Sequence, residues 1–173
     1  KSSGWKFDRW ERDLSINDVS ADKIFQQARA RLISMDILPP DILEYTAQWN
    51  HESRLPQPDD LIFQRTHLLK FGAFRFLDVL SAIRVRTVVD DPGHFALQYT
   101  ATKGHPERGH STYTIQQVAN AVKFTIQTVS QPANILTKLA NPIITRRTQL
   151  RITNAVLDYT KTAVHLDLSG VEI

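Results

Sequence analysis

Apolar and polar residues alternate along four consecutive stretches between Ile83 and Ser130, which is the pattern of half-buried β-strands. Three short segments separate these stretches, at 90–93, 104–109 and 119–120. They contain Gly, Pro, Asn or Asp, whose backbone preferences favour tight turns. Strands joined by short turns pair antiparallel. The pattern therefore predicts an antiparallel meander with the 104–109 turn at its middle.

Two other stretches have the period of an amphipathic helix. Between Ala21 and Met35, apolar residues recur three and four positions apart, and Ser20 precedes them as a good N-cap. Between Pro142 and about His165, a longer apolar stripe begins with a proline, which suits the first helical position. We predict a helix in each stretch.

The rest of the chain has weaker patterns. Residues 76–80 fit either a helical turn or part of a strand. The other predicted elements are strands over Trp5–Leu14, Ile42–Trp49 and Leu61–Lys70, a helical stretch over 132–140 and a tail over 166–173 that resembles a strand end.

The order of these elements indicates an α+β fold. Strands follow one another in a run, and helices lie near the two ends of the chain. A curved antiparallel sheet needs a cover for its concave face, and the helix from Pro142 is the one element long enough to provide it. We therefore expect a single domain over residues 1–173, with a sheet that grips this helix and a space for a small molecule between them.

Composition narrows the possible functions. The 173 residues are 42% hydrophobic and 23% charged, as in ordinary globular proteins, and the net charge is +3. This small, scattered excess does not indicate a nucleic-acid partner. There is no cysteine, which excludes a disulfide, a thiolate nucleophile and a cysteine zinc site. No apolar run reaches the ~18 residues of a membrane span. We expect a cytoplasmic protein, and its oligomeric state stays open.

One motif carries a resemblance to a known family. The run Gly104-His105-Pro106-Glu107-Arg108-Gly109 follows two sequence segments with a strand pattern, Arg84–Asp90 and Phe95–Thr102. Val122–Ile126 and the start of the last helix follow it at matching distances. The chain here resembles the uncharacterised family catalogued as domain of unknown function nineteen-ninety. The family pattern has an acidic residue after the second glycine, where this chain has His110.

The resemblance implies the helix-grip fold of the START and birch-pollen-allergen superfamily. It also implies a lipophilic ligand, although it supplies no activity. We expect the ligand-binding residues to lie in the 104–110 turn, on the neighbouring strands and on the last helix. These candidates are Tyr99, His105, Glu107, His110, Tyr113 and Gln149.

The 104–110 turn admits other chemistry. His105, Glu107 and His110 are residue types that bind a divalent metal, but a metal site usually needs further ligands from elsewhere. Turn preferences favour side chains that bond their own backbone, so we expect neither a metal nor a cofactor. His105 and Glu107 also suit an acid–base pair. Gly104 and Gly109 would let backbone amides approach a ligand.

Three functions remain open at this stage. The first is a binding protein for a small lipophilic molecule held in an internal cavity, lined in part by aromatic residues such as Trp49, Phe95 and Phe124. The second is a cyclase, dehydratase or hydrolase that uses His105 and Glu107 for proton transfer. The third is a protein-interaction module whose core is filled.

Overall fold

The computed structural model describes residues 4–39, 42–71, 74–103, 107–132 and 142–170, with side chains at all of these positions except 43, 66–79, 107, 132 and 142–149. Its elements, in chain order, are β1 (Lys6–Asp13), α1 (Ala21–Ser34), β2 (Leu43–Ala47), α2 (Gln48–His51), β3 (Leu61–Phe71), β4 (Phe74–Asp91), β5 (His94–Ala101), β6 (Glu107–Val118), β7 (Ala121–Pro132) and α4 (Pro142–Ser169).

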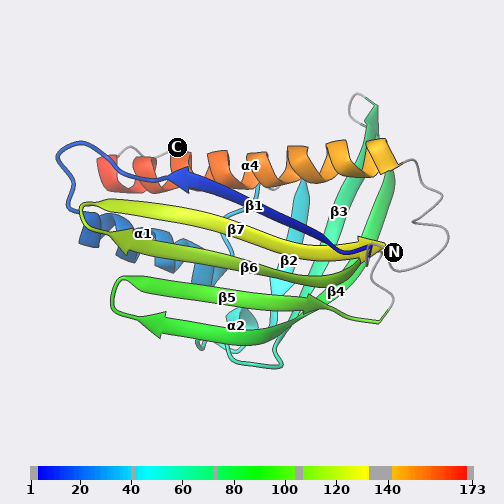
Figure 1. The fold of residues 1–173 in the computed structure, drawn as a ribbon, viewed down its shortest axis with the longest axis horizontal. Helices are drawn as coiled ribbons and strands as arrows, with labels where there is room; N and C mark the ends of the chain where they lie inside the picture. The colour runs from blue at the N-terminus through cyan, green and yellow to red at the C-terminus, as the bar shows by residue number, and fades with distance from the viewer. Residues whose placement is uncertain (1–3, 40–41, 72–73, 104–106, 133–141, 171–173) are drawn as a thin grey trace.

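The strands form one seven-stranded sheet in the order β1-β7-β6-β5-β4-β3-β2. All neighbouring strands pair antiparallel. Figure 1 shows that the sheet is strongly curved, because β3 and the first part of β4 run steeply to the direction of β5, β6 and β7, whereas the second part of β4 runs alongside β5. The α+β fold, with a long C-terminal helix held by a curved antiparallel sheet, is confirmed.

Two helices, rather than one, cover the sheet. The long helix α4 runs alongside β1, and Arg12 of β1 forms an ion pair with Asp158 of α4 at 2.7 Å. The shorter helix α1 packs on β6 and β7 and also contacts α4 (Figure 1). The buried core contains residues of the sheet and of both helices. The expectation that the C-terminal helix alone covers the concave face is therefore incomplete.

Local chemistry sets the bounds of α1 close to those predicted. The Ser20 hydroxyl accepts a hydrogen bond from the Lys23 backbone amide at 3.4 Å, as an N-cap does. Met35 ends the helix in the left-handed conformation, with φ of 62°. The buried side of the helix consists of Ile24, Phe25, Ala28 and Leu32.

Several predicted boundaries are wrong. Trp49 lies in the short helix α2 rather than on a strand, and its indole donates a hydrogen bond to the Ile33 carbonyl at 2.7 Å. Residues 76–80, for which a helical turn and a strand were both open, belong to β4, so the strand alternative is correct there. The middle turn is shorter than predicted, because β6 already begins at Glu107. Helix α4 continues to Ser169, where a tail was expected. The predicted helical stretch over 132–140 lies, apart from Pro132 of β7, outside the described residues.

A bulge in β4 also changes which residues face the core. Val85 pairs with Tyr99 and Thr87 with Gln98, so Arg86 is an extra residue in its strand. Beyond the bulge, Val88 packs against the core and Thr87 is exposed. Simple alternation had placed Thr87 on the same face as Val85.

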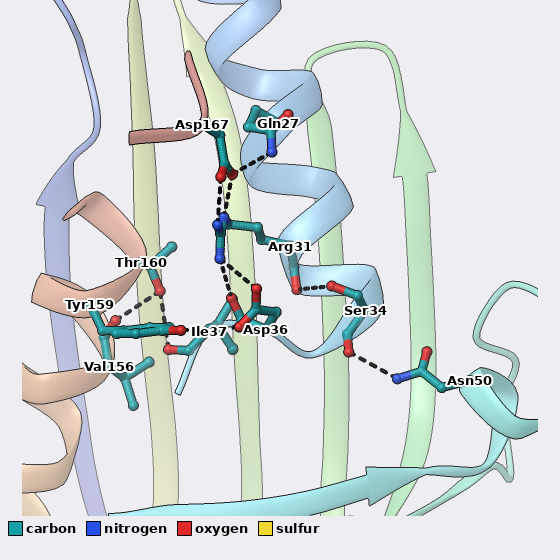
Figure 2. Close-up of polar contacts among 10 residues, drawn as sticks. All are labelled: Gln27, Arg31, Ser34, Asp36, Ile37, Asn50, Val156, Tyr159, Thr160 and Asp167. Atoms are coloured by element: carbon teal, nitrogen blue, oxygen red, sulfur yellow. Dashed lines mark hydrogen bonds and ion pairs between the residues drawn. The ribbon is translucent and has the colours of Figure 1, made fainter. Parts of the chain in front are cut away.

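A polar cluster joins α1 to the C-terminal half of α4 (Figure 2). The Arg31 guanidinium donates to the Asp167 carboxylate from Nε at 2.6 Å and from Nη2 at 2.7 Å. Its Nη1 donates to Asp36 at 2.6 Å. Gln27 also donates to Asp167, and Tyr159 donates to Asp36 at 3.2 Å. We call Arg31, Asp167 and Asp36 the helix clasp, because they hold α4 against α1.

Candidate ligand-binding hollow

The face of the sheet that packs on the helices, its inner face, changes character along the strands. Opposed residues of antiparallel neighbours share a face, so the register defines rows that cross the sheet. Toward the turn at 119–120 the rows carry large side chains. One row contains Phe124, Ile115 and Phe95, and the next contains Trp10, Ile126, Tyr113 and Leu97.

The following two rows are different. Thr128, Ser111 and Tyr99 oppose one another and form what we call the hydroxyl row. Beyond it lie Ser130 opposite Gly109, and Ala101 opposite Ile83. We call Ser130, Gly109 and Ala101 the small-residue row. Large apolar side chains thus give way first to hydroxyl groups and then to almost no side chain at all.

A hollow of about 140 Å³ opens where these two rows lie. It is smaller than the roughly 300–1,000 Å³ of sites that enclose a drug-sized ligand. It is close to the size of a cavity that holds a single benzene ring, about 150 Å³. The described residues that line it are Gln64, Ile83, Tyr99, Ala101, Arg108, Gly109, His110, Ser111, Thr128 and Ser130.

Neutral hydrogen-bonding groups form the floor of the hollow. Ser111 Oγ and Thr128 Oγ1 lie 3.0 Å apart, and either can be the donor. Each hydroxyl keeps capacity for another bond, since a hydroxyl has one donor and two acceptor positions. Burial raises the pKa of Tyr99 well above its ordinary value, and the neighbouring Tyr113 adds to the effect. Tyr99 therefore stays protonated at neutral pH.

An aromatic cluster supports Tyr99 from behind. The rings of Tyr99 and Tyr113 meet edge to face, with centroids 5.2 Å apart and planes at 85°. Tyr113 meets Phe124 in the same way at 6.0 Å and 88°. Such T-shaped pairs contribute about 0.5–1.5 kcal/mol beyond area burial. The cluster fixes the Tyr99 ring, which is 9% exposed, at the edge of the hollow.

The predicted site residues are distributed unevenly around the hollow. Tyr99 lines it, and Tyr113 lies one row behind it. His110 borders it, but it pairs with Thr100 and Val129. Strand alternation therefore directs the His110 side chain to the face opposite Ser111.

The other predicted site residues are not tested by the structure. Glu107 begins β6 and Gln149 lies in α4, but both side chains are outside the described part. His105 is outside the described residues altogether. The acid–base pair of His105 and Glu107 therefore stays a prediction.

Gly109 has a structural role in addition to the one expected. A Cβ at this position would lie 1.9 Å from the Val129 carbonyl oxygen on the paired strand, and φ is +145°. Glycine is thus required here by the close approach of β6 to β7. The expectation that Gly109 lets a backbone amide approach a ligand stays a prediction.

Four uncharged polar lining residues were missed by reasoning from the sequence alone: Gln64, Ser111, Thr128 and Ser130. Nothing in their local pattern distinguishes them from solvated strand residues. The strand register could have identified them, because the row of hydroxyl and small side chains becomes visible once the strands are aligned in pairs.

The aromatic candidates from elsewhere in the chain belong to the packed core. Trp49 and Phe124 are 0% exposed, and Phe95 is 1% exposed. The filled core around them fits the interaction-module hypothesis, and a hollow of about 140 Å³ is too small to refute it. That hypothesis stays open.

The described residues contain no group of three or more His, Cys, Asp or Glu side chains that could hold a metal ion. In the same part of the chain, no helix is both long and apolar enough to cross a membrane.

The architecture defines the class of protein. A curved antiparallel sheet that grips a long C-terminal helix is the helix-grip fold of the START and birch-pollen-allergen type. By sequence, the chain belongs to the family described as Domain of unknown function (DUF1990), which it matches over residues 2–159. The resemblance seen around the 104–109 motif is thereby confirmed. A search of the curated protein sequences found no match.

Solved structures of low sequence identity share this fold. A hypothetical protein from Helicobacter pylori has a TM-score of 0.63 at 10% identity, covering 92% of this chain and 87% of that one. Human STARD10 has a TM-score of 0.56 at 9% identity, covering 92% and 63% of the two chains. Norcoclaurine synthase from Thalictrum flavum has a TM-score of 0.52 at 14% identity, covering 90% and 94%. At these identities the likeness establishes the fold alone.

Proposed function

We propose that the protein binds a small, mostly apolar molecule on the inner face of the sheet, with one end of the molecule in the hollow. The observation that carries the proposal is the change from large apolar rows to the hydroxyl and small-residue rows. A sheet face that is packed against helices ordinarily keeps large side chains along its length, because close packing favours the folded state. Here the side chains become small where hydrogen-bonding groups begin, as they do in ligand sites.

The fold supports the same proposal. Helix-grip proteins place a sheet around a helix, and the resemblance to the superfamily implied a lipophilic ligand. The hollow accommodates one end of such a molecule, so the remainder would extend along the inner face toward α4.

The test is to fill the hollow and measure bound ligand. Ala101 belongs to the small-residue row, so Ala101→Leu would place three additional carbon atoms in the hollow. The matched control is Ala82→Leu, since Ala82 precedes Ile83 and alternation puts it on the opposite face of the sheet. Non-denaturing mass spectrometry of the purified proteins would show whether a small molecule accompanies each one.

We expect a reproducible adduct of a few hundred daltons on the wild type and on Ala82→Leu, and little or none on Ala101→Leu. Solvent extraction would then identify its class. An adduct retained in full by Ala101→Leu would contradict binding in the hollow. A wild-type protein that carries no adduct, and takes up none from a panel of lipophilic compounds, would contradict the function itself.

A further inference from the structure

The polar side chains that line the hollow from the inner face of the sheet are hydroxyl and amide groups, which carry no charge at neutral pH. The floor presents the hydroxyl groups of Ser111, Thr128 and Tyr99, and the Gln64 amide lies at its rim. Burial keeps the Tyr99 phenol protonated, because it raises the pKa of that group. Hydroxyl and amide groups both donate and accept hydrogen bonds. They can therefore satisfy a neutral ligand group of either kind.

Within the part of the chain whose side chains are described, charged groups border the hollow without facing its floor. Among the described lining residues, Arg108 is the only Lys, Arg, Asp or Glu, and it is exposed. Arg108 pairs with Gln131 next to the Gly109–Ser130 pair, so alternation directs its side chain to the outer face. On β1, Asp8 opposes Thr128 and Lys6 opposes Ser130, but neither of them lines the hollow.

This arrangement discriminates by charge. An ion that enters a partly desolvated site without a counter-charge loses more hydration than hydroxyl groups return. A neutral hydroxyl, carbonyl or amide exchanges its bonds with water for equivalent bonds to the hydroxyl row. The size of the hollow limits the inserted end to about the volume of one six-membered ring.

We propose that the ligand enters the hollow with an uncharged hydrogen-bonding end, such as an alcohol, ketone or amide, and that the hydroxyl row disfavours carboxylate, phosphate and ammonium ends. This inference rests on the proposed function and adds the chemical class of the ligand. It places the recognition on Ser111, Thr128 and Tyr99.

The test compares three probes that differ only in their end group: octanol, octanoate and octylammonium. Each is titrated at pH 7 into the full chain, and binding is measured by calorimetry and by amide chemical shifts of β6 and β7. We expect octanol to bind at least about tenfold more tightly than either ion. Thr128→Val keeps the side-chain shape and removes one hydroxyl of the row, so it should weaken octanol binding about three- to tenfold.

The control variant is Thr112→Val. Thr112 lies next to Ser111 on β6 but faces the other way, and its hydroxyl accepts a hydrogen bond from Gln98 at 3.1 Å. The same chemical change is thus made on the opposite face, and octanol affinity should stay within about twofold of wild type.

The outcomes separate the two proposals. If octanol binds most tightly, and Thr128→Val weakens its binding while Thr112→Val does not, the result supports both binding in the hollow and selection against charged ends. If octanoate or octylammonium binds as tightly as octanol, and Ala101→Leu abolishes that binding, the charge selection is wrong while binding in the hollow stands. If none of the three probes binds in a way that Ala101→Leu abolishes, both proposals fail.

Discussion

Removal of Arg31 is the sharpest test of how the two helices are held together. The side chain of Arg31 is 15% exposed, and those of its partners Asp167 and Asp36 are 29% and 53% exposed. Arg31→Met keeps much of the aliphatic stem and removes the guanidinium. Both contacts of Arg31 in the helix clasp, which Figure 2 draws as dashed lines, are then lost, while we expect the apolar packing around them to change little.

The expected loss follows from the geometry. Two charge-assisted hydrogen bonds join Arg31 to Asp167, and each contributes about 1.5 kcal/mol at the lower end of the usual range. The bond to Asp36 adds less than about 1 kcal/mol, because that carboxylate is more than half exposed. In the variant, water partly replaces the two hydrogen bonds that Asp167 accepted from Arg31. We therefore expect a decrease of about 2–3 kcal/mol in the free energy of unfolding. For a domain of this size that corresponds to a fall of about 5–10 °C in Tm.

Urea unfolding at pH 7 measures this loss, and a double-mutant cycle with Asp167→Asn isolates the pair. We expect a coupling of about 1 kcal/mol or more. The control is Arg9→Met, whose partner Glu11 lies two residues away on the exposed edge strand; this change should alter stability by less than about 0.5 kcal/mol. A loss of under about 0.5 kcal/mol for Arg31→Met, or strict additivity with Asp167→Asn, would refute the clasp as a stabilising contact.

The same pair has a defined pH dependence. Arg31 holds the pKa of the Asp167 carboxyl below its ordinary value through their hydrogen bond. A carboxyl whose pKa is lowered by folding stabilises the protein above its unfolded value, about 3.9, and loses that contribution as pH falls through the folded value. The coupling measured at pH 7 should therefore persist at pH 5 and decrease below about pH 4.

Two further predictions concern Gly109 at the hollow and Asp60 in the loop before β3. Gly109→Ala places a Cβ 1.9 Å from the Val129 oxygen, so we expect a loss of about 3 kcal/mol or more in urea unfolding. The control is Gly93→Ala, at a glycine with φ of +71° where the nearest atom to an added Cβ lies 3.5 Å away. This variant should lose only about 1–2 kcal/mol in the free energy of unfolding. Equal losses for the two variants would show that the close approach of β7 to Gly109 does not cause the larger loss. Asp60 is 5% exposed and accepts from both Arg54 and the Gln57 amide, so Asp60→Asn should lose about 2–3 kcal/mol at pH 7. Arg54 holds the Asp60 pKa below its ordinary value, so the difference from wild type should shrink below about pH 4, and a constant difference would argue against the ion pair.

The elements that were predicted well have strong local signals. Helix α1 combines an N-cap serine with an uninterrupted apolar period. The β6–β7 turn falls at 119–120 as predicted, and the β4–β5 turn falls at 92–93, within the predicted 90–93. Each of these signals lies within a few neighbouring residues. The antiparallel meander followed from them, because short connections leave adjacent strands no other pairing.

The errors have tertiary causes. Trp49 continues an alternating pattern, but its indole bonds the end of α1, and the backbone there is helical rather than extended. The bulge at Arg86 has no local signal of its own, because its neighbours are ordinary strand residues. Residues 107–110 contain the glycine of a turn motif, yet they pair with β7 as a strand. In each case a contact with a distant segment overrode the local preference.

The hollow was the least predictable feature, since it depends on the register of several strands at once. Ser111, Thr128 and Ser130 are unremarkable in the sequence, and small polar residues on a strand usually face solvent. Their meaning changes when pairing places Thr128 opposite Ser111, Ser111 opposite Tyr99, and Ser130 opposite Gly109. A one-residue slip of β7 against β6 would turn Thr128 and Ser130 outward and bring Gln127 and Val129 inward. Gly109 permits this alignment, because a Cβ at that position would lie 1.9 Å from the Val129 carbonyl oxygen on β7. The residue that was expected to let a backbone amide approach a ligand thus contributes to the site through the close contact of β6 with β7 next to the hydroxyl row.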